Sequence, residues 1–479
     1  MAALQVVVSG AVIFFLFRYL IKNIGAEGVG VWSIVLATAS ASRIGEMGFT
    51  ASAVKFTAKY LSRGDKKLAS EVIQTTAITV GVVLAILFVS GYSVIVWILR
   101  LIIPGEGINE AILILPYALL SMWIGALAGV FLSGLDGCQR INLRAVVSII
   151  SSIFFLLLVI LLVPSKGLIG LAWAQIGQGL IMLLGGIIFL RKVLSSLPRI
   201  IFKWNYLLFK EMINYGINFQ ITSICSILFD PFTKALIAKF GDLSSVAYYE
   251  MANRMVLQFR MLVVSVAQVM VPKMAELFEI APEKIQATYL YGYRVMFFVS
   301  IPLFFGVIAI APLASEVWIG DFNQSFILYV VLLSIAYWIN SLTVPAYFGF
   351  MGIGLMRWNT WAHILIAVLN IVFGYGLGYV LGGAGVIMGY LISLLFGSCV
   401  VIIAYNREYE IPLDSLIPIE SIRLLFVATL GLVIGWILLY FVGEYFDILM
   451  GSWMLVGVFF ITVIPVALMH PLGKLIKLN

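Results

Sequence analysis

The chain has little charge, and few of its residues are of the kinds that bind metals. Of its 479 residues only 11% are charged and 63% are hydrophobic, whereas a soluble domain carries roughly 25% charged residues. This scarcity of charge excludes a water-soluble core. The three cysteines (Cys138, Cys225 and Cys399) and the two histidines (His363 and His470) are far apart in sequence. We therefore expect no metal site, no disulfide framework and no cofactor other than a possible coupling ion, Na⁺ or H⁺.

Long apolar runs are abundant. A helix of about 20 apolar residues spans the ~30 Å hydrocarbon core of a bilayer. The runs predict an all-α polytopic membrane protein with about fourteen transmembrane helices, in which residues 2–24 are the first span and not a signal peptide. The predicted spans are 2–24, 29–50, 72–103, 111–135, 143–163, 167–190, 214–240, 246–272, 289–313, 323–351, 357–380, 384–405, 421–443 and 451–470.

Lysine and arginine are concentrated in alternate links between the spans. Twenty of the 29 lie in one set of links and their flanks, and only four lie in the opposite set. The positive-inside bias places the rich set in the cytoplasm. We therefore predict that both termini are cytoplasmic and that the chain resides in the cell membrane. The same bias explains the net charge of +7 without a nucleic-acid partner.

Two similar halves are visible in the sequence. Residues 23–34 resemble residues 239–250, with Gly25 aligned with Gly241, and Arg144 aligns with Arg357 at a similar offset. An even number of spans per half gives both halves the same orientation, in a parallel pseudo-twofold repeat around a central cavity. The predicted domains are an N-terminal six-helix lobe (1–190), an amphipathic cytoplasmic linker (191–213), a C-terminal six-helix lobe (214–405) and two additional helices (406–479).

Charged residues inside the predicted spans are the candidate site. The cations are Arg18, Arg43, Lys234, Arg254 and Arg260, and the acids are Glu46, Asp230 and Glu250. A charge at mid-bilayer is costly, so such residues usually face a wet cavity or a partner. The acids lie at helical spacing from three of the cations, in the pairs Arg43–Glu46, Asp230–Lys234 and Glu250–Arg254. In one interpretation these pairs only help the spans to pack.

In the other interpretation the five cations line a substrate cavity. They exceed the three acids by two, and neither Arg18 nor Arg260 has an acid within one helical turn. A cationic cavity in a low-dielectric surround attracts anions, and the planar guanidinium suits phosphate. We predict a pyrophosphate-bearing amphiphile as the substrate. The three acids are candidates for ion coupling or charge pairing.

The sequence also resembles a known family. The residues that carry the resemblance are Gly25, Glu27, Gly28, Gly30 and Trp32, the run Glu46-Met47-Gly48-Phe49, the segment from Lys55 to Asp65, and Ala247-Tyr248-Tyr249 with Ala252-Asn253-Arg254. They resemble the polysaccharide-biosynthesis (O-antigen type) flippases of the multidrug/oligosaccharidyl-lipid/polysaccharide exporter superfamily.

The resemblance implies two six-helix lobes around a V-shaped cavity and alternating access. The implied substrate is an oligosaccharide linked to a polyprenyl or dolichyl (pyro)phosphate, which is moved to the outer face of the membrane. The other implied partners are membrane lipids and polysaccharide assembly proteins. Cations from spans 1, 2, 7 and 8 line the cavity in the family, and Arg18, Arg43, Lys234 and Arg254 occupy those positions.

Two other functions are possible from the sequence. A multidrug or cation antiporter of the same superfamily would favour acidic residues in its site, and the excess of cations argues against it. A membrane glycosyltransferase or polymerase would need catalytic groups at the membrane surface, but the acids there are scattered. We therefore expect a transporter and no enzymatic activity.

Overall fold

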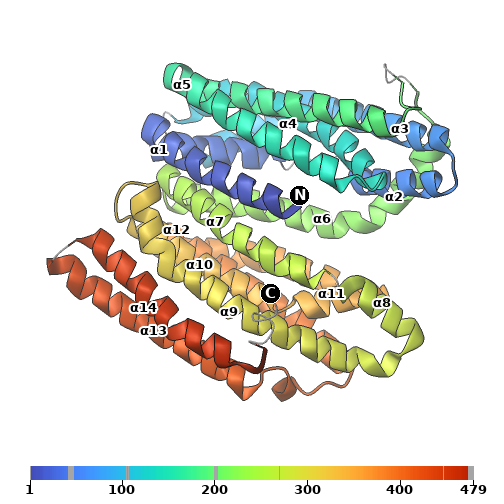
Figure 1. Ribbon diagram of the computed structural model, residues 1–479. Helices are drawn as coiled ribbons and strands as arrows, with labels where there is room; N and C mark the ends of the chain where they lie inside the picture. Colours follow the sequence, from blue (N-terminus) through green and yellow to red (C-terminus); the bar gives the residue numbers. More distant parts are fainter. Residues whose placement is uncertain are drawn as a thin grey trace. The chain divides into compact units, whose positions relative to one another are not determined.

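The computed structural model describes residues 2–40, 48–103, 105, 107–198, 203–268, 270–445 and 447–472. Within these ranges the secondary structure is entirely helical (Figure 1). The α-helices are α1 (Ala2–Ser40), α2 (Phe49–Ser62), α3 (Lys66–Ile102), α4 (Gly107–Gly137), α5 (Ile141–Val193), α6 (Tyr206–Phe240), α7 (Leu243–Ala267), α8 (Met270–Ile280), α9 (Ile285–Trp318), α10 (Gln324–Ser341), α11 (Val344–Ile353), α12 (Arg357–Glu408), α13 (Ile419–Tyr445) and α14 (Ile448–Met469).

Three of these helices are double, and each changes direction at a glycine. The backbone has φ values of 71° at Gly25 in α1, 53° at Gly167 in α5 and 65° at Gly382 in α12. Positive φ is strained for residues with a Cβ and is accessible to glycine. The double helices α5 and α12 therefore each hold two of the predicted spans. Helix α1 holds span 2–24 and only the first part of span 29–50, because residues 41–47 lie outside the described residues. Nine of the helical stretches in the described part of the chain are long and apolar enough to cross a membrane, which confirms a polytopic helical protein.

Contacts divide the chain into two compact units, Met1–Ala247 and Tyr248–Asn479. In the first unit α4 packs along α5, and α1 contacts both of them. Helix α6 contacts α1, α2 and α3 and is thus part of this unit. The lobe boundaries predicted at residues 190, 213 and 405 stay predictions.

The second unit is built around α9. Helices α10, α13 and α14 all pack against α9, and α12 packs against α10. Figure 1 shows α13 and α14 side by side along α9. The core of the unit is apolar and aromatic, with Phe298, Phe350 and Phe459 almost fully buried. The two additional C-terminal helices therefore cover one face of the second unit.

The internal repeat appears in the turns between helices. Left-handed backbone occurs at Gly105 and again at Gly320, and at Gln139 and again at Gly354. Each pair is separated by 215 residues, the same separation as between the turn glycines of α5 and α12. The two halves therefore repeat the same order of turns, in a register of 215 residues and not the 213 that places Arg144 over Arg357. The parallel orientation of the two halves stays a prediction. The apolar helical sequences tolerate a shift of two residues, whereas the turn geometry does not.

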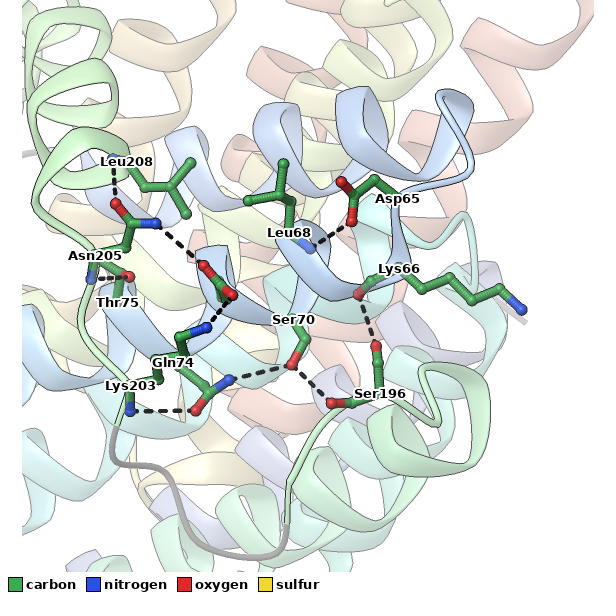
Figure 2. A network of polar contacts seen from close by, with 11 residues as sticks. Asp65, Lys66, Leu68, Ser70, Gln74, Thr75, Ser196, Lys203, Asn205 and Leu208 are labelled. Atoms are coloured by element: carbon green, nitrogen blue, oxygen red, sulfur yellow. Dashed lines mark hydrogen bonds and ion pairs between the residues drawn. The ribbon is translucent and has the colours of Figure 1, made fainter.

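A polar network fastens the segment between α5 and α6 to the start of α3 (Figure 2). The Ser196 hydroxyl donates to the Lys66 carbonyl at 2.7 Å. Lys203 forms an ion pair with Glu71, which also accepts a hydrogen bond from the Asn205 amide at 3.1 Å. The described part of the predicted linker is thus tied to the protein. Its orientation along a membrane surface stays a prediction.

Glu211 makes a second connection, between α6 and α2. It accepts hydrogen bonds from Lys59 Nζ at 2.5 Å and from the Tyr60 hydroxyl at 3.1 Å. Burial raises the pKa of Glu211, but these two hydrogen bonds outweigh it and leave the pKa below its ordinary value. A carboxyl group with a lowered pKa stabilises the fold above its unfolded pKa of about 4.3, and the contribution is lost as the pH falls through the folded pKa.

We therefore expect Glu211→Gln to lower the melting temperature of the purified protein at pH 7. The difference from the wild type should be smaller at an acidic pH well below the ordinary glutamate pKa of about 4.3, because the wild-type carboxyl group stabilises the fold only while it is ionised. Glu276→Gln is the matched control, because Glu276 forms an exposed pair with Lys273 and contributes little. An equal deficit for Glu211→Gln at both pH values would contradict this account.

Candidate functional site

The predicted site residues are distributed over both units. Arg43 and Glu46 lie outside the described residues. Arg18 is an exposed residue of α1, and no carboxylate that the structure describes forms an ion pair with it. Asp230 and Lys234 belong to α6, whereas Glu250, Arg254 and Arg260 belong to α7. A cavity that joins all five cations stays a prediction.

Both predicted pairs in the described part of the chain are formed. Lys234 Nζ lies 2.7 Å from Asp230 Oδ2, and the Lys234 side chain is only 6% exposed. Arg254 Nε lies 2.5 Å from Glu250 Oε1, with Glu250 buried and Arg254 partly exposed. A buried charge needs such a partner, because removing it leaves an uncompensated ion. These contacts agree with charge pairing and leave a further role in ion coupling untested.

Arg260 has a different environment, because its partner is an amide. Its Nη2 donates to Asn340 Oδ1 at 2.8 Å, and the Asn340 amide in turn lies 3.5 Å from Ser398 Oγ. The guanidinium also lies over the ring of Tyr337, 5.6 Å from its centroid. Its Nε is buried and has no hydrogen-bond partner among the described residues. The arginine therefore keeps its charge and one unused donor.

A cavity of about 230 Å³ opens beside Arg260. Its polar lining comes from α7, α10, α11, α12 and the turn between α10 and α11, and consists of Arg260, Asn340, Thr343, Tyr347, Asn359, His363 and Ser398. No carboxylate is among the residues that line it. Asn359 is fully buried, and its Oδ1 has no hydrogen-bond partner in the described part of the structure. The cavity is thus lined by one cation, several neutral polar side chains and no carboxylate.

Polar contacts continue from Arg260 along α7. Tyr337 stacks on the guanidinium and donates its hydroxyl proton to Asn253 Oδ1 at 2.9 Å. The Tyr390 hydroxyl lies 2.5 Å from the same Tyr337 hydroxyl. Asn253 and Arg260 are seven residues apart and so share one face of α7. The network fixes the orientation of the ring beneath Arg260 and connects three helices of the second unit.

Such a cavity suits an anionic group. An arginine in a low-dielectric environment binds phosphate or carboxylate oxygens through charge-assisted hydrogen bonds. The volume equals that of about seven or eight water molecules at roughly 30 Å³ each, which leaves room for a phosphate or diphosphate group. The described residues contain no cluster of His, Cys, Asp and Glu that could hold a metal ion.

An apolar cavity lies in the same unit. It has a volume of about 590 Å³ and is lined by side chains of α7, α9 and α14, among them Phe259, Pro302 and Phe460. Phe259 is the neighbour of Arg260 in the chain. The second unit therefore offers both a small cationic cavity and a larger apolar one.

Sequence reasoning identified Arg260 and missed the residues that surround it. Asn340, Asn359 and Ser398 are neutral, and such residues are common in membrane helices. His363 is an isolated histidine in the sequence, which predicts no metal site. One sequence feature could have indicated this polar lining: Asn359 and His363 are four residues apart and therefore lie on one face of a helix.

Comparisons with known proteins agree with this architecture. A family model described as polysaccharide biosynthesis protein matches residues 3–278. No curated protein sequence matches the chain.

Solved structures of transporters share the fold. The lipid II flippase MurJ in an inward closed conformation has a TM-score of 0.75 at 15% identity, covering 99% of both chains. An inward-facing MATE family multidrug transporter of the MOP superfamily also has a TM-score of 0.75, at 16% identity, covering 83% of this chain and 94% of its own. A Vibrio cholerae MATE transporter has a TM-score of 0.53 at 15% identity, covering 85% of this chain and 99% of its own. The chain has a MATE- and MurJ-like fold and belongs to the polysaccharide biosynthesis protein family.

Proposed function

We propose that the protein is a flippase that moves a polyprenyl-(pyro)phosphate-linked oligosaccharide across the cell membrane by alternating access. Membership of the polysaccharide biosynthesis family supports a role in glycan export. The fold is similar to that of a lipid II flippase. The non-enzymatic character of the process, the cytoplasmic termini and an association with other assembly proteins belong to this proposal.

The Arg260 cavity is the observation that carries the proposal. Its single formal charge is positive, and the Nε of Arg260 has no partner among the described residues. A phosphate oxygen would bind the Arg260 guanidinium where it lines the cavity, and the sugar hydroxyls would suit neighbouring amides such as Asn359. A polyprenyl tail would find apolar contacts in the 590 Å³ cavity of the same unit.

Depletion of the protein tests the function directly. We expect the lipid-linked glycan to accumulate on the inner leaflet, where it can be extracted and identified by mass spectrometry. A multidrug antiporter, the alternative within the superfamily, would instead change the accumulation of cationic drugs. Depletion without a lipid-linked intermediate, combined with increased drug retention, would replace the proposal by this alternative.

The Asp230–Lys234 pair gives a prediction about the driving force. In the proposal Asp230 binds the coupling ion, Na⁺ or H⁺, when Lys234 moves towards substrate. Asp230→Asn should abolish the dependence of flipping on an imposed ion gradient in proteoliposomes and leave substrate binding largely intact. Asp414→Asn is the control, because Asp414 is exposed outside the predicted spans. An unchanged ion dependence in Asp230→Asn would exclude this role.

A further inference from the structure

A basic cavity lies in the first unit, and none of the predicted site residues is among those that line it. Its volume is about 410 Å³, and it is located where the two ends of the α5 hairpin meet the turn after α4. The residues that line it are Gln139, Arg140, Asn142, Leu143, Lys192 and Val193. They comprise two cations, two amides and no carboxylate.

Both cations of this cavity are uncompensated. The nearby acid Asp136 is engaged by Arg144, whose Nη1 lies 2.5 Å from its Oδ2. The neighbouring Arg191 donates to the Pro198 carbonyl at 3.1 Å. Neither Arg140 nor Lys192 forms an ion pair with any carboxylate that the structure describes. Arg144 therefore neutralises Asp136, and no carboxylate that the structure describes neutralises the two cations of the cavity. The Lys192 ammonium lies over the Phe189 ring, 5.7 Å from its centroid.

The backbone beside the cavity also favours an anion. Helix α5 begins at Ile141, and its N-cap residue Arg140 makes no side-chain capping hydrogen bond. The first N–H groups of a helix lack intrahelical acceptors and carry the positive end of the helix dipole. They add to the positive potential that the two side chains create.

An exposed apolar stripe leads to the same cavity. Leu180, Leu184 and Ile188 follow at intervals of four residues on α5 and are 42%, 54% and 52% exposed. Lys192 continues this interval. Residues spaced by four lie on one face of a helix, so the stripe ends at the basic cavity. Because α5 is long and apolar enough to span a membrane, this face is suited to contact hydrocarbon.

We propose that this cavity binds the phosphodiester headgroup of an anionic phospholipid of the surrounding bilayer, with an acyl chain along the stripe. A soluble phosphate would use the cavity but not the stripe, and a zwitterionic lipid would place its own cation beside Arg140. The cavity lies between links that the charge bias assigns to the cytoplasmic side, where the leaflet surface is negatively charged. The site is independent of the proposed flippase activity.

Titration of the detergent-purified full-length protein with phosphatidylglycerol tests this site, with the shift in melting temperature as the readout. The double variant Arg140→Gln/Lys192→Gln should bind about 10- to 30-fold more weakly, the factor that two surface cations contribute. The matched control Arg63→Gln/Lys67→Gln removes two exposed cations of the same unit that do not line the cavity, and it should leave the affinity near the wild-type value.

Further titrations test the contributions of the apolar stripe and of the lipid headgroup separately. Leu184→Gln/Ile188→Gln should weaken phosphatidylglycerol binding and leave any response to inorganic phosphate unchanged. Phosphatidylcholine should give little stabilisation of the wild type. Three results would each overturn the proposal. The wild type and Arg140→Gln/Lys192→Gln could bind phosphatidylglycerol equally well, inorganic phosphate alone could give the full stabilisation, or phosphatidylcholine could stabilise the wild type as much as phosphatidylglycerol does.

Discussion

Replacing Arg260 with alanine is expected to reduce glycan export by about 10- to 100-fold, the range that corresponds to a charge-assisted hydrogen bond of about 1.5–3 kcal/mol. The variant removes the only formal charge among the residues that line the 230 Å³ cavity. It also removes the donor to Asn340 and leaves the cavity neutral. Export is measured in cells depleted of the native protein, at matched levels of membrane-inserted variant.

Arg260→Lys separates charge from geometry. Lysine keeps the positive charge but lacks the planar fork that binds two phosphate oxygens and stacks on an aromatic ring. The stacking on Tyr337 and the hydrogen bond to Asn340 both depend on the guanidinium. We therefore expect export between that of the wild type and that of Arg260→Ala.

Arg423→Ala is the matched control for these variants. Arg423 is an exposed arginine of α13 in the same unit and does not line the cavity. Its replacement removes an identical charge, so it should leave export near the wild-type level. Wild-type export by Arg260→Ala at matched protein levels would refute the anion-binding role of the cavity.

The sequence predicted the spans well because hydrophobic length determines them. The glycines that turn the double helices lie at the edges of the predicted spans, as Gly25 does after span 2–24 and Gly167 at the start of span 167–190. The residues between predicted spans 29–50 and 72–103 are rich in lysine and arginine, and a sequence-based prediction gives them no buried face. In the structure most of this segment belongs to α2 (Phe49–Ser62), and one face of α2 is buried through Phe49, Phe56 and Tyr60.

The candidate site was only partly visible in the sequence. Helical spacing reveals a partner three or four residues away, as for Asp230 and Lys234, and both are indeed paired. The partner of Arg260 is Asn340, which is 80 residues distant and neutral. Contacts between helices depend on crossing angle and rotation, and a single sequence does not encode these in its spacing. The absence of a nearby acid was therefore predictable, but the amide and the cavity were not.

The internal repeat gives a second prediction with a large expected effect, a loss of stability on substitution of two glycines that are 215 residues apart. In the second half of α5, a Cβ on Gly170 would lie 2.4 Å from the Leu162 carbonyl oxygen. In the second half of α12, a Cβ on Gly385 would lie 2.0 Å from the Leu377 carbonyl oxygen. Both neighbours are backbone atoms, so the two halves of each hairpin must separate to admit alanine.

Gly170→Ala and Gly385→Ala should each destabilise the protein by about 1–3 kcal/mol or more, as overpacking does. For a chain of this size, about 1–3 kcal/mol lowers the melting temperature by roughly 1–6 °C, with the larger shifts where each unit unfolds by itself. The controls are Gly129→Ala in α4 and Gly376→Ala in α12, where an added Cβ meets no atom within 4 Å.

The controls should behave in the opposite direction, because alanine is favoured over glycine inside a helix by about 1 kcal/mol. Thermal unfolding of all four variants in detergent, monitored by size-exclusion chromatography, measures the difference in stability between the two test variants and the two controls. Since Gly170 and Gly385 occupy equivalent positions of the repeat, the two variants should be impaired alike, one in each unit. If Gly385→Ala lost stability and Gly170→Ala did not, the close packing of the two hairpin arms would stabilise only the second unit. The α5 and α12 hairpins would then share a backbone course without sharing its contribution to stability.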